Sequence, residues 1–224
     1  MTRRLRHSSR GVFLFTCRST GQAWLASLLV AALGVLPADR AEADILWAGD
    51  AGYSVSSTIL VGQAGPGSLT VNGGSILTVS PAESLAGMYI GGLRVAPLQG
   101  QGTVTIDGVN SEVHSRIDIT GPGAVLHVGV WGTESTGDLI ISNGGALTST
   151  FFHVGLGDFA GSGGARGTVL VDGPGSSVML SGSGPPGGPG GGIIGGDQGS
   201  GTVTLSNGAT LGLTAVGATI GGPR

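Results

Sequence analysis

The chain of 224 residues has no lysine, one cysteine and few charged residues, and each shortage excludes a class of protein. Arginine supplies all ten basic residues, and charged residues make up only 10% of the chain. Because a nucleic-acid binder presents a basic surface to phosphates, this composition excludes nucleic acid as an expected partner. Cys17 has no second cysteine with which to form an intramolecular disulfide.

A long hydrophobic run is also missing, and the longest apolar stretch covers only residues 24–36. That length is too short to span a bilayer comfortably, but it matches the core of a signal peptide. Pro37 ends the run, and Ala41 and Ala43 form the small-x-small pattern of a cleavage site. Five arginines precede the run: Arg3, Arg4, Arg6, Arg10 and Arg18. We therefore predict a helical signal peptide over residues 1–43; an N-terminal anchor helix is the alternative.

Cleavage after Ala43 would change the charge and the chemistry of the protein. Residues 44–224 keep four arginines against eleven acidic residues, a formal net charge of −7. Cys17 would be removed with the leader. The exported chain would then contain no membrane span, and backbone hydrogen bonds and stacked aliphatic side chains would have to hold it together.

Glycine, in contrast, is abundant, with 47 residues against the roughly 7% of an average protein. A collagen triple helix is excluded because glycine does not recur at every third position. Disorder is disfavoured because 40% of the residues are hydrophobic and the aliphatic ones form short β-branched runs. The composition therefore predicts many short strands separated by tight turns.

Two interleaved repeats run through the chain. The first joins a hydrophobic-Gly pair to a strand-like run ending in Asn-Gly, over residues 61–74, 128–145 and 194–208, with starts 67 and 66 residues apart. The second begins at Ile90, Val154 and Ile220, with starts 64 and 66 residues apart. Two series of nearly equal period indicate a true structural repeat.

The repeated strand alternates Val and Thr, which places them on opposite faces, and Asn-Gly or Asp-Gly then makes a tight turn. An isolated hairpin would use this turn to reverse the chain. Fixed spacing instead favours a solenoid, so we predict an all-β, right-handed parallel β-helix over residues 60–224, with residues 44–59 as a lead-in or cap. Asn72, Asn143 and Asn207 should occupy equivalent corners with stacked amides. At about 20–25 residues per coil, each double repeat would make about three coils, and the chain seven or eight.

The repeat pattern resembles those of bacterial autotransporter (type V secretion) passengers and PEP-CTERM-associated proteins. Residues 90–111, 127–150, 154–177 and 194–214 carry the resemblance. It implies an exported protein of a Gram-negative bacterium, located at the cell surface, on the outer membrane or outside the cell. The chain stops at Arg224 without the family's C-terminal barrel or sorting signal, so we expect a truncated repeat and a missing translocator or anchor in a longer product; a degenerate member that has lost its anchor is the alternative.

No catalytic residue or cofactor-binding residue is predicted. Polysaccharide lyases and hydrolases with β-helical folds are the natural alternative, but they need clustered carboxylates and often a basic partner. The acidic residues here are dispersed, and Asp107 and Asp172 are explained as turn residues. We therefore expect that the chain is not an enzyme.

No metal-binding residue is predicted either. His127 and His153 each precede the Val-Gly of a repeat and could stack on one face, but a metal site needs a third ligand. The equivalent positions hold Leu60, Tyr89, Ile193 and Thr219, which favours a variable, solvent-facing position. Single Gly-Asp copies at residues 157–158 and 195–197 do not make the tandem repeat of a calcium site.

The sequence thus predicts an exported structural passenger that acts in surface display or adhesion, with extracellular glycans or host and matrix surfaces as partners. Tyr89, Trp131, Phe151 and Phe152 could form a sugar-stacking surface, although packing in the core or rim is the simpler interpretation. The alternatives are a carbohydrate-active β-helix enzyme and an inactive fragment of a longer autotransporter.

Overall fold

A computed structural model provides the fold of the chain. The chain divides into two compact units, Met1–Ala41 and Glu42–Arg224. The structure describes residues 43–48, 52–56, 58–63, 65–81, 87–92, 100–108, 114–121, 124–131, 134–157, 164–182, 192–196, 199–214 and 218–220, all in the second unit. The predicted signal-peptide helix over residues 1–43 lies almost entirely outside this range.

Eighteen strands form three six-stranded parallel sheets, here called A, B and C. Sheet A contains β1 (Ala43–Ala48), β4 (Pro66–Asn72), β7 (Gln101–Asp107), β10 (Thr136–Ser142), β13 (Arg166–Asp172) and β16 (Ser200–Ser206). Sheet B contains β2 (Gly52–Val55), β5 (Ile76–Val79), β8 (Arg116–Ile119), β11 (Ala146–Ser149), β14 (Ser177–Leu180) and β17 (Thr210–Leu213). Sheet C contains β3 (Ile59–Val61), β6 (Gly87–Ile90), β9 (Val125–Val128), β12 (Phe151–Leu156), β15 (Gly192–Gly196) and β18 (Ala218–Ile220).

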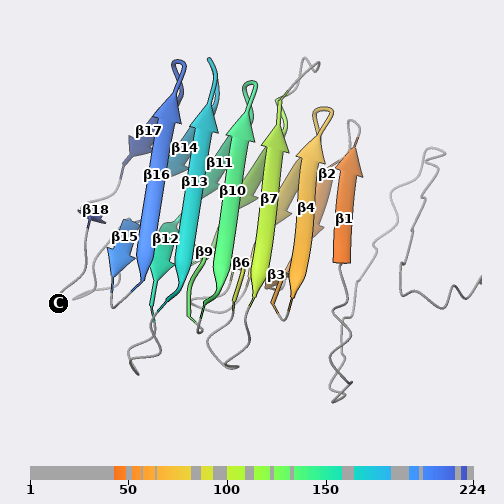
Figure 1. Cartoon of the computed structure of the whole chain (residues 1–224). Helices are drawn as coiled ribbons and strands as arrows, with labels where there is room; N and C mark the ends of the chain where they lie inside the picture. Colours follow the sequence, from red (N-terminus) through yellow and green to blue (C-terminus); the bar gives the residue numbers. More distant parts are fainter. Residues whose placement is uncertain are drawn as a thin grey trace, which may run out of the picture. The chain divides into compact units, whose positions relative to one another are not determined.

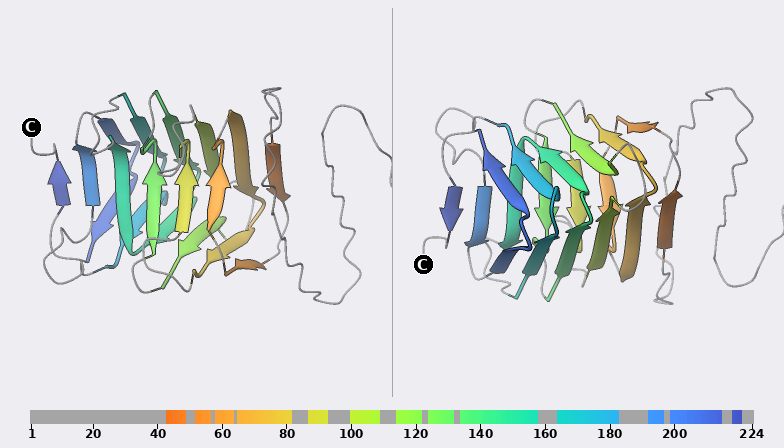
Figure 2. Two further views of the ribbon diagram at one scale, coloured as in Figure 1. Left: turned by 90° about the horizontal axis from the view of Figure 1, so that it is seen from below. Right: turned by 90° about the horizontal axis from the view of Figure 1, so that it is seen from above.

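The second unit is a β-solenoid in which the chain visits sheets A, B and C in turn, six times over (Figures 1 and 2). In the view of Figure 1, the chain runs upward through each strand of sheet A and then passes behind through sheets B and C. It returns to sheet A one strand closer to β16, which makes the coil right-handed. Every strand pair is parallel, because equivalent strands of successive coils lie side by side. The predicted all-β parallel β-helix is confirmed.

Each double repeat makes two coils, so the expectation of about three was wrong. In sheet A, Leu69 pairs with Val104, Val104 with Leu139, and Leu139 with Val169, at steps of 35, 35 and 30 residues. A coil is therefore longer than three short strands and three tight turns require. The additional residues lie in the segments that connect the strands, and the total is six coils rather than seven or eight.

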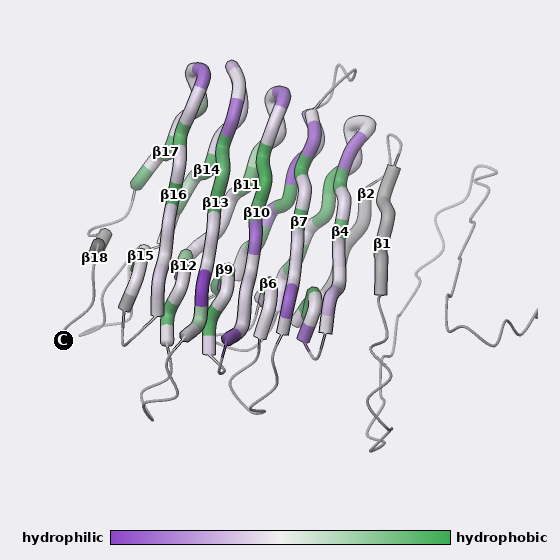
Figure 3. The backbone as a smooth tube through the Cα atoms, in the orientation of Figure 1, coloured by the Kyte–Doolittle hydropathy of each residue, from purple (hydrophilic) through white to green (hydrophobic). Residues whose placement is uncertain are grey.

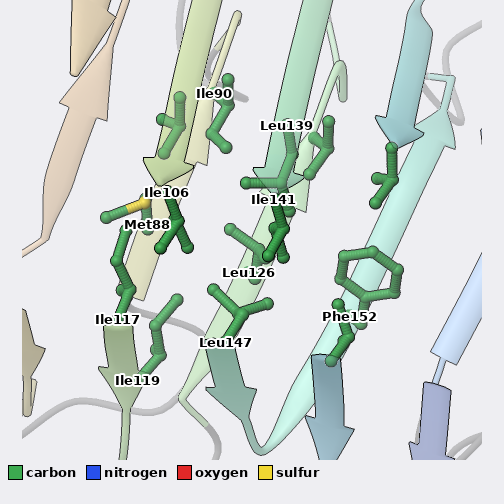
Figure 4. Close-up of a cluster of buried hydrophobic side chains, with 14 of the residues drawn as sticks. Met88, Ile90, Ile106, Ile117, Ile119, Leu126, Leu139, Ile141, Leu147 and Phe152 are labelled. Carbon is green, nitrogen blue, oxygen red and sulfur yellow. The ribbon is translucent and has the colours of Figure 1, made fainter. Parts of the chain in front are cut away.

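Inward side chains from all three sheets form one aliphatic core. The burial pattern of β7, β10 and β13 alternates strictly, and the inward aliphatic positions are buried: Val104, Ile106, Leu139, Ile141, Val169 and Val171. Figure 4 shows Ile106 and Leu139 from sheet A meeting Leu147 from sheet B and Leu126 from sheet C. Stacking turns a repeated Val-x-Val pattern into continuous buried columns, which a single repeat could not bury alone.

The corner between sheets A and B is hydrophilic along its outer edge, where the strands of sheet A end (Figure 3). Inside the corner, the fully buried Ser115 hydroxyl accepts a hydrogen bond of 3.0 Å from the backbone N–H of Gly74, one coil earlier. Ser176 accepts the equivalent 3.0 Å bond from the N–H of Gly144. These serines satisfy backbone amides that the turn removes from the strand ladder.

The three corner asparagines are not equivalent, which corrects the prediction of stacked amides. Asn72 lies one position earlier in the coil than Asn143, because β10 pairs Ser142 with Asp107 and β4 pairs Val71 with Ile106. Asn143 donates from Nδ2 to Asp107 Oδ1 at 3.0 Å, so the amide bonds a carboxylate of the preceding coil. The Asn-Gly pairs look equivalent in the sequence, but the strand register shows that Asn72 is shifted by one residue.

The recurring hydrophobic-Gly pair marks the corner at which sheet C ends. Gly129 has φ +58°, and a Cβ atom on it would lie 1.7 Å from the carbonyl oxygen of Arg166 in the next coil. Gly62, Gly91 and Gly155 show the same close approach, to Gln101, Thr136 and Ser200. The backbone of successive coils therefore comes so close at this corner that only glycine fits.

Residues 44–59, suggested as a lead-in or cap, contribute β1 and β2 to the first coil, and β1 pairs with β4 over six residues. At the other end, Leu205 and Leu213 in β16 and β17 are 44% and 46% exposed, although their equivalents Val171 and Leu180 are buried. The core is thus complete in the middle coils and partly open at β16 and β17.

Candidate functional site

The outer face of sheet C carries the most unusual group of side chains in the described part of the chain. Strand register places six residues in one column: Leu60, Tyr89, His127, His153, Ile193 and Thr219. Their neighbours along each strand, such as Ile90, Val128 and Val154, point into the core. The sequence prediction that these six positions are equivalent is confirmed.

His127 lies at the centre of a small aromatic cluster with Tyr89, Trp131 and His153. The ring of Tyr89 stacks on His127 with centroids 4.4 Å apart, and Trp131 lies against it at 4.7 Å. His153, from the next coil, meets His127 edge-on at 4.9 Å and 61°. The two Nδ1 atoms are 3.3 Å apart. We call these four residues the aromatic cluster.

His127 is fully buried, so the prediction of a solvent-facing position was wrong for the middle coils. The reason is a second apolar layer outside sheet C, formed by Val130, Trp131 and Leu156 together with Tyr89. Val130 and Trp131 directly follow the corner glycine of β9, and the N–H of Trp131 donates to the carbonyl oxygen of Leu156 at 2.9 Å.

The apolar layer controls the charge of both histidines. Burial lowers the pKa of His127 well below its ordinary value, and repulsion from His153 lowers it further. Burial alone lowers the pKa of His153 to about 4. Both imidazoles are therefore neutral at pH 7, and each presents one unprotonated ring nitrogen. Among the described residues, Nε2 of His127 has no hydrogen-bond partner.

The acidic residues do not gather at this cluster. Asp172 accepts hydrogen bonds from Ser206 at 2.6 Å and Asn207 at 2.7 Å, which lower its pKa. Asp107 holds Asn143 in the same way at the preceding corner, so both aspartates act at turns, as predicted. Among the described ranges, no three His, Cys, Asp or Glu residues come together to hold a metal.

Asp158 and Asp197, the acidic members of the two single Gly-Asp sequences, lie outside the described residues. The structure does describe Gly157 and places Gly195 and Gly196 in β15.

The aromatic residues considered for sugar stacking are packed instead. Tyr89, Trp131 and Phe151 are 7%, 8% and 7% exposed, and Phe152 points into the main core at 1%. Packing, the simpler interpretation, is confirmed. The second apolar layer itself was not predicted, although one signal existed: apolar residues continue after the Val-Gly step in Val130-Trp131 and at Leu156.

A shallow groove of about 320 Å³ lies on sheet A over β4, β7 and β10. Polar side chains line it, including Ser68, Thr103 and Thr136 with hydroxyls, Gln101 with an amide and Asp138 with a carboxylate. Asp138 is exposed and lies beside Thr103 in the sheet register. Such a lining can exchange hydrogen bonds with a hydroxyl-rich ligand.

Comparison with protein families, with curated proteins and with solved structures found no match to this chain. Within the described ranges, no helix has the length and apolar character needed to cross a bilayer.

Proposed function

We propose that this chain is an exported structural repeat protein whose β-solenoid acts in cell-surface display or adhesion. The observation that carries the proposal is the in-register solenoid, in which six coils share one aliphatic core. A solenoid of this kind is a rigid scaffold with an extended lateral surface, which suits display and contact. The arginine-rich start, short apolar run and Ala41-x-Ala43 pattern support export.

The proposal includes a structural rather than an enzymatic role. Three described carboxylates have structural partners: Asp107 and Asp172 hold corner side chains, and Asp118 pairs with Arg116 at 2.8 Å. A lyase or hydrolase would need such groups free to transfer protons. Incubation of the purified protein with acidic and neutral polysaccharides should leave chain length and reducing ends unchanged, and detectable cleavage would establish the enzyme alternative.

The groove over β4, β7 and β10 is the proposed contact surface for extracellular glycans. A glycan array would test it with Gln101→Ala and Asp138→Ala together, because both side chains line the groove. Met179→Ala is the matched control, since Met179 is exposed on sheet B, away from the groove. Binding that the double variant loses and the control keeps would support adhesion to glycans; equal binding by all three would reject this surface.

Export is tested by fractionating cells that express the full chain and sequencing its N-terminus. We expect the protein outside the cytoplasm, beginning at Asp44. Ala43→Asp should block processing, because a charged residue replaces the small one that signal peptidase requires. Ala48→Asp, which leaves the cleavage pattern intact, is the control. A full-length cytoplasmic protein that begins near Met1 would contradict the export proposal.

A further inference from the structure

The histidine pair of the aromatic cluster brings two ring nitrogens from successive coils together. Nδ1 of His127 and Nδ1 of His153 are 3.3 Å apart, a distance at which one ring can donate a hydrogen bond to the other when no metal is bound. The two rings meet at 61°, so they are not stacked face to face. The atoms that converge here are ring nitrogens, which are common ligands of transition metals.

We propose that His127 and His153 form a binding site for a divalent transition metal, with Zn²⁺ as the best-fitting ion, bridging their Nδ1 atoms. The site uses the outer face of sheet C, between β9 and β12. It does not depend on the proposed role in display or adhesion.

The separation of the nitrogens selects the coordination geometry. Two nitrogens bound to one zinc at about 2.0–2.1 Å with tetrahedral angles lie about 3.3–3.4 Å apart. Neighbouring ligands at a square-planar or octahedral centre meet at right angles, which brings them to about 3.0 Å or less at similar bond lengths. The observed 3.3 Å matches the spacing of a tetrahedral ion more closely than that of the other two geometries.

The surroundings prepare the pair for a metal. Burial keeps both imidazoles neutral at pH 7, so no proton has to be displaced before a lone pair can bind. Tyr89 stacks on one face of His127 and Trp131 lies against it, which fixes the ring in place. With Nδ1 bound to the metal, the tautomer of His127 is set, and Nε2 carries the proton.

The site would be open rather than closed. The described residues supply two ligands, so the third ligand that a metal site needs, and the fourth, would come from water or from an exogenous donor. His127 is fully buried and His153 only partly, so the ion would enter from the side of His153. Such a site exchanges its metal readily and differs from the four-ligand sites that hold folds together.

The test is a titration of the purified, chelator-treated full chain, without a polyhistidine tag, with Zn²⁺ by calorimetry and with Co²⁺ by visible absorption. We expect one ion per chain and the intense absorption of tetrahedral Co²⁺. His153→Ala should weaken binding by more than about 100-fold, since losing even an outer-shell partner of a metal ligand costs about 10- to 100-fold.

His114→Ala is the matched control, because His114 is an exposed histidine at the corner before β8 and lies outside the aromatic cluster. It should bind as the parent does. His153→Gln, which keeps side-chain volume better than alanine, guards against a folding defect, and circular dichroism would confirm the fold of each variant. A dissociation constant weaker than about 1 mM, weak octahedral Co²⁺ bands, or unchanged binding in folded His153→Ala or His153→Gln would overturn the proposal.

Discussion

Individual residues at the corners decide whether the coils can stack. Asn143 and Asn207 both adopt φ 52°, in the left-handed region, at a position where other coils have glycine. Asparagine tolerates this conformation better than other residues with a Cβ, and its amide also reaches the aspartate of the preceding coil. Backbone conformation and a coil-to-coil hydrogen bond therefore select the same residue.

Substitution of Asn143 should separate these two contributions. Asn143→Gly keeps the left-handed backbone but loses the bond to Asp107, whereas Asn143→Ala loses both. We expect alanine to lower the free energy of unfolding by about 1–2 kcal/mol more than glycine does. Urea denaturation of the two variants measures the difference, and equal stabilities would show that the left-handed conformation costs little here.

The corner glycine Gly129 should tolerate no side chain. A Cβ on it would meet the carbonyl oxygen of Arg166 at 1.7 Å in a backbone with φ +58°. Gly129→Ala should therefore destabilise the fold by about 3 kcal/mol or more, from overpacking and strain together. Thermal unfolding followed by circular dichroism provides the measurement.

Gly208→Ala is the control for Gly129→Ala. Gly208 also has a positive φ, +83°, but the nearest atom to an added Cβ is 3.9 Å away. Gly208→Ala should lower the free energy of unfolding only by the cost of placing a residue with a Cβ in the left-handed conformation, about 1–2 kcal/mol. Similar losses in the two variants would mean that the close approach of coils at Gly129 relaxes easily.

At the scale of the strand, the stability that a strand contributes depends on whether neighbouring coils cover it on both sides. In β10, Leu139 and Ile141 are fully buried because β7 and β13 flank them. In β16, the same alternation leaves Leu205 44% exposed. The same alternating pattern therefore contributes more to stability in β10 than in β16.

Alanine substitutions in β10 and β16 should show this inequality. Ile141→Ala should cost about 2–5 kcal/mol, because it removes buried methylenes and leaves a cavity. Leu205→Ala should cost less than about 1.5 kcal/mol, since nearly half of the side chain already contacts water. Chemical denaturation of both variants compares them, and a larger loss at Leu205 would show that β16 is covered in solution.

At the scale of the whole molecule, the buried histidines make stability depend on pH. A folded-state pKa below the unfolded value means that the unfolded chain binds protons first, so stability is complete above about pH 6.5. It should fall as pH drops toward 4, the folded pKa of His153. The free energy of unfolding lost through His153 alone would reach about 3 kcal/mol. His127 would lower it further in the same direction.

This dependence can be measured by urea denaturation between pH 7 and pH 4.5 with a chelator present. His153→Gln removes one of the two titrating groups and should flatten the curve, whereas His114→Ala, at an exposed position, should leave it unchanged. A parent protein equally stable at both ends of the range would show that folding does not lower the pKa values of the pair.

The sequence alone determined the architecture because its signals are local and repeated. Val-x-Val alternation defines two faces of a strand, and a constant spacing of hydrophobic-Gly pairs requires equivalent strands to meet. The register of Leu60, Tyr89, His127 and His153 followed from that spacing and is confirmed.

The tertiary structure alone decided which positions are buried and how many residues close a coil. Coil length depends on connecting segments whose composition does not reveal their path, so two coils per double repeat could not be read from the repeats. The burial of His127 depends on Trp131, which follows it by four residues and lies against its ring, and on Tyr89 and Leu156 from the neighbouring coils. Periodicity fixes which residues share a column, but only packing from outside the column determines whether that column meets water or a second apolar layer.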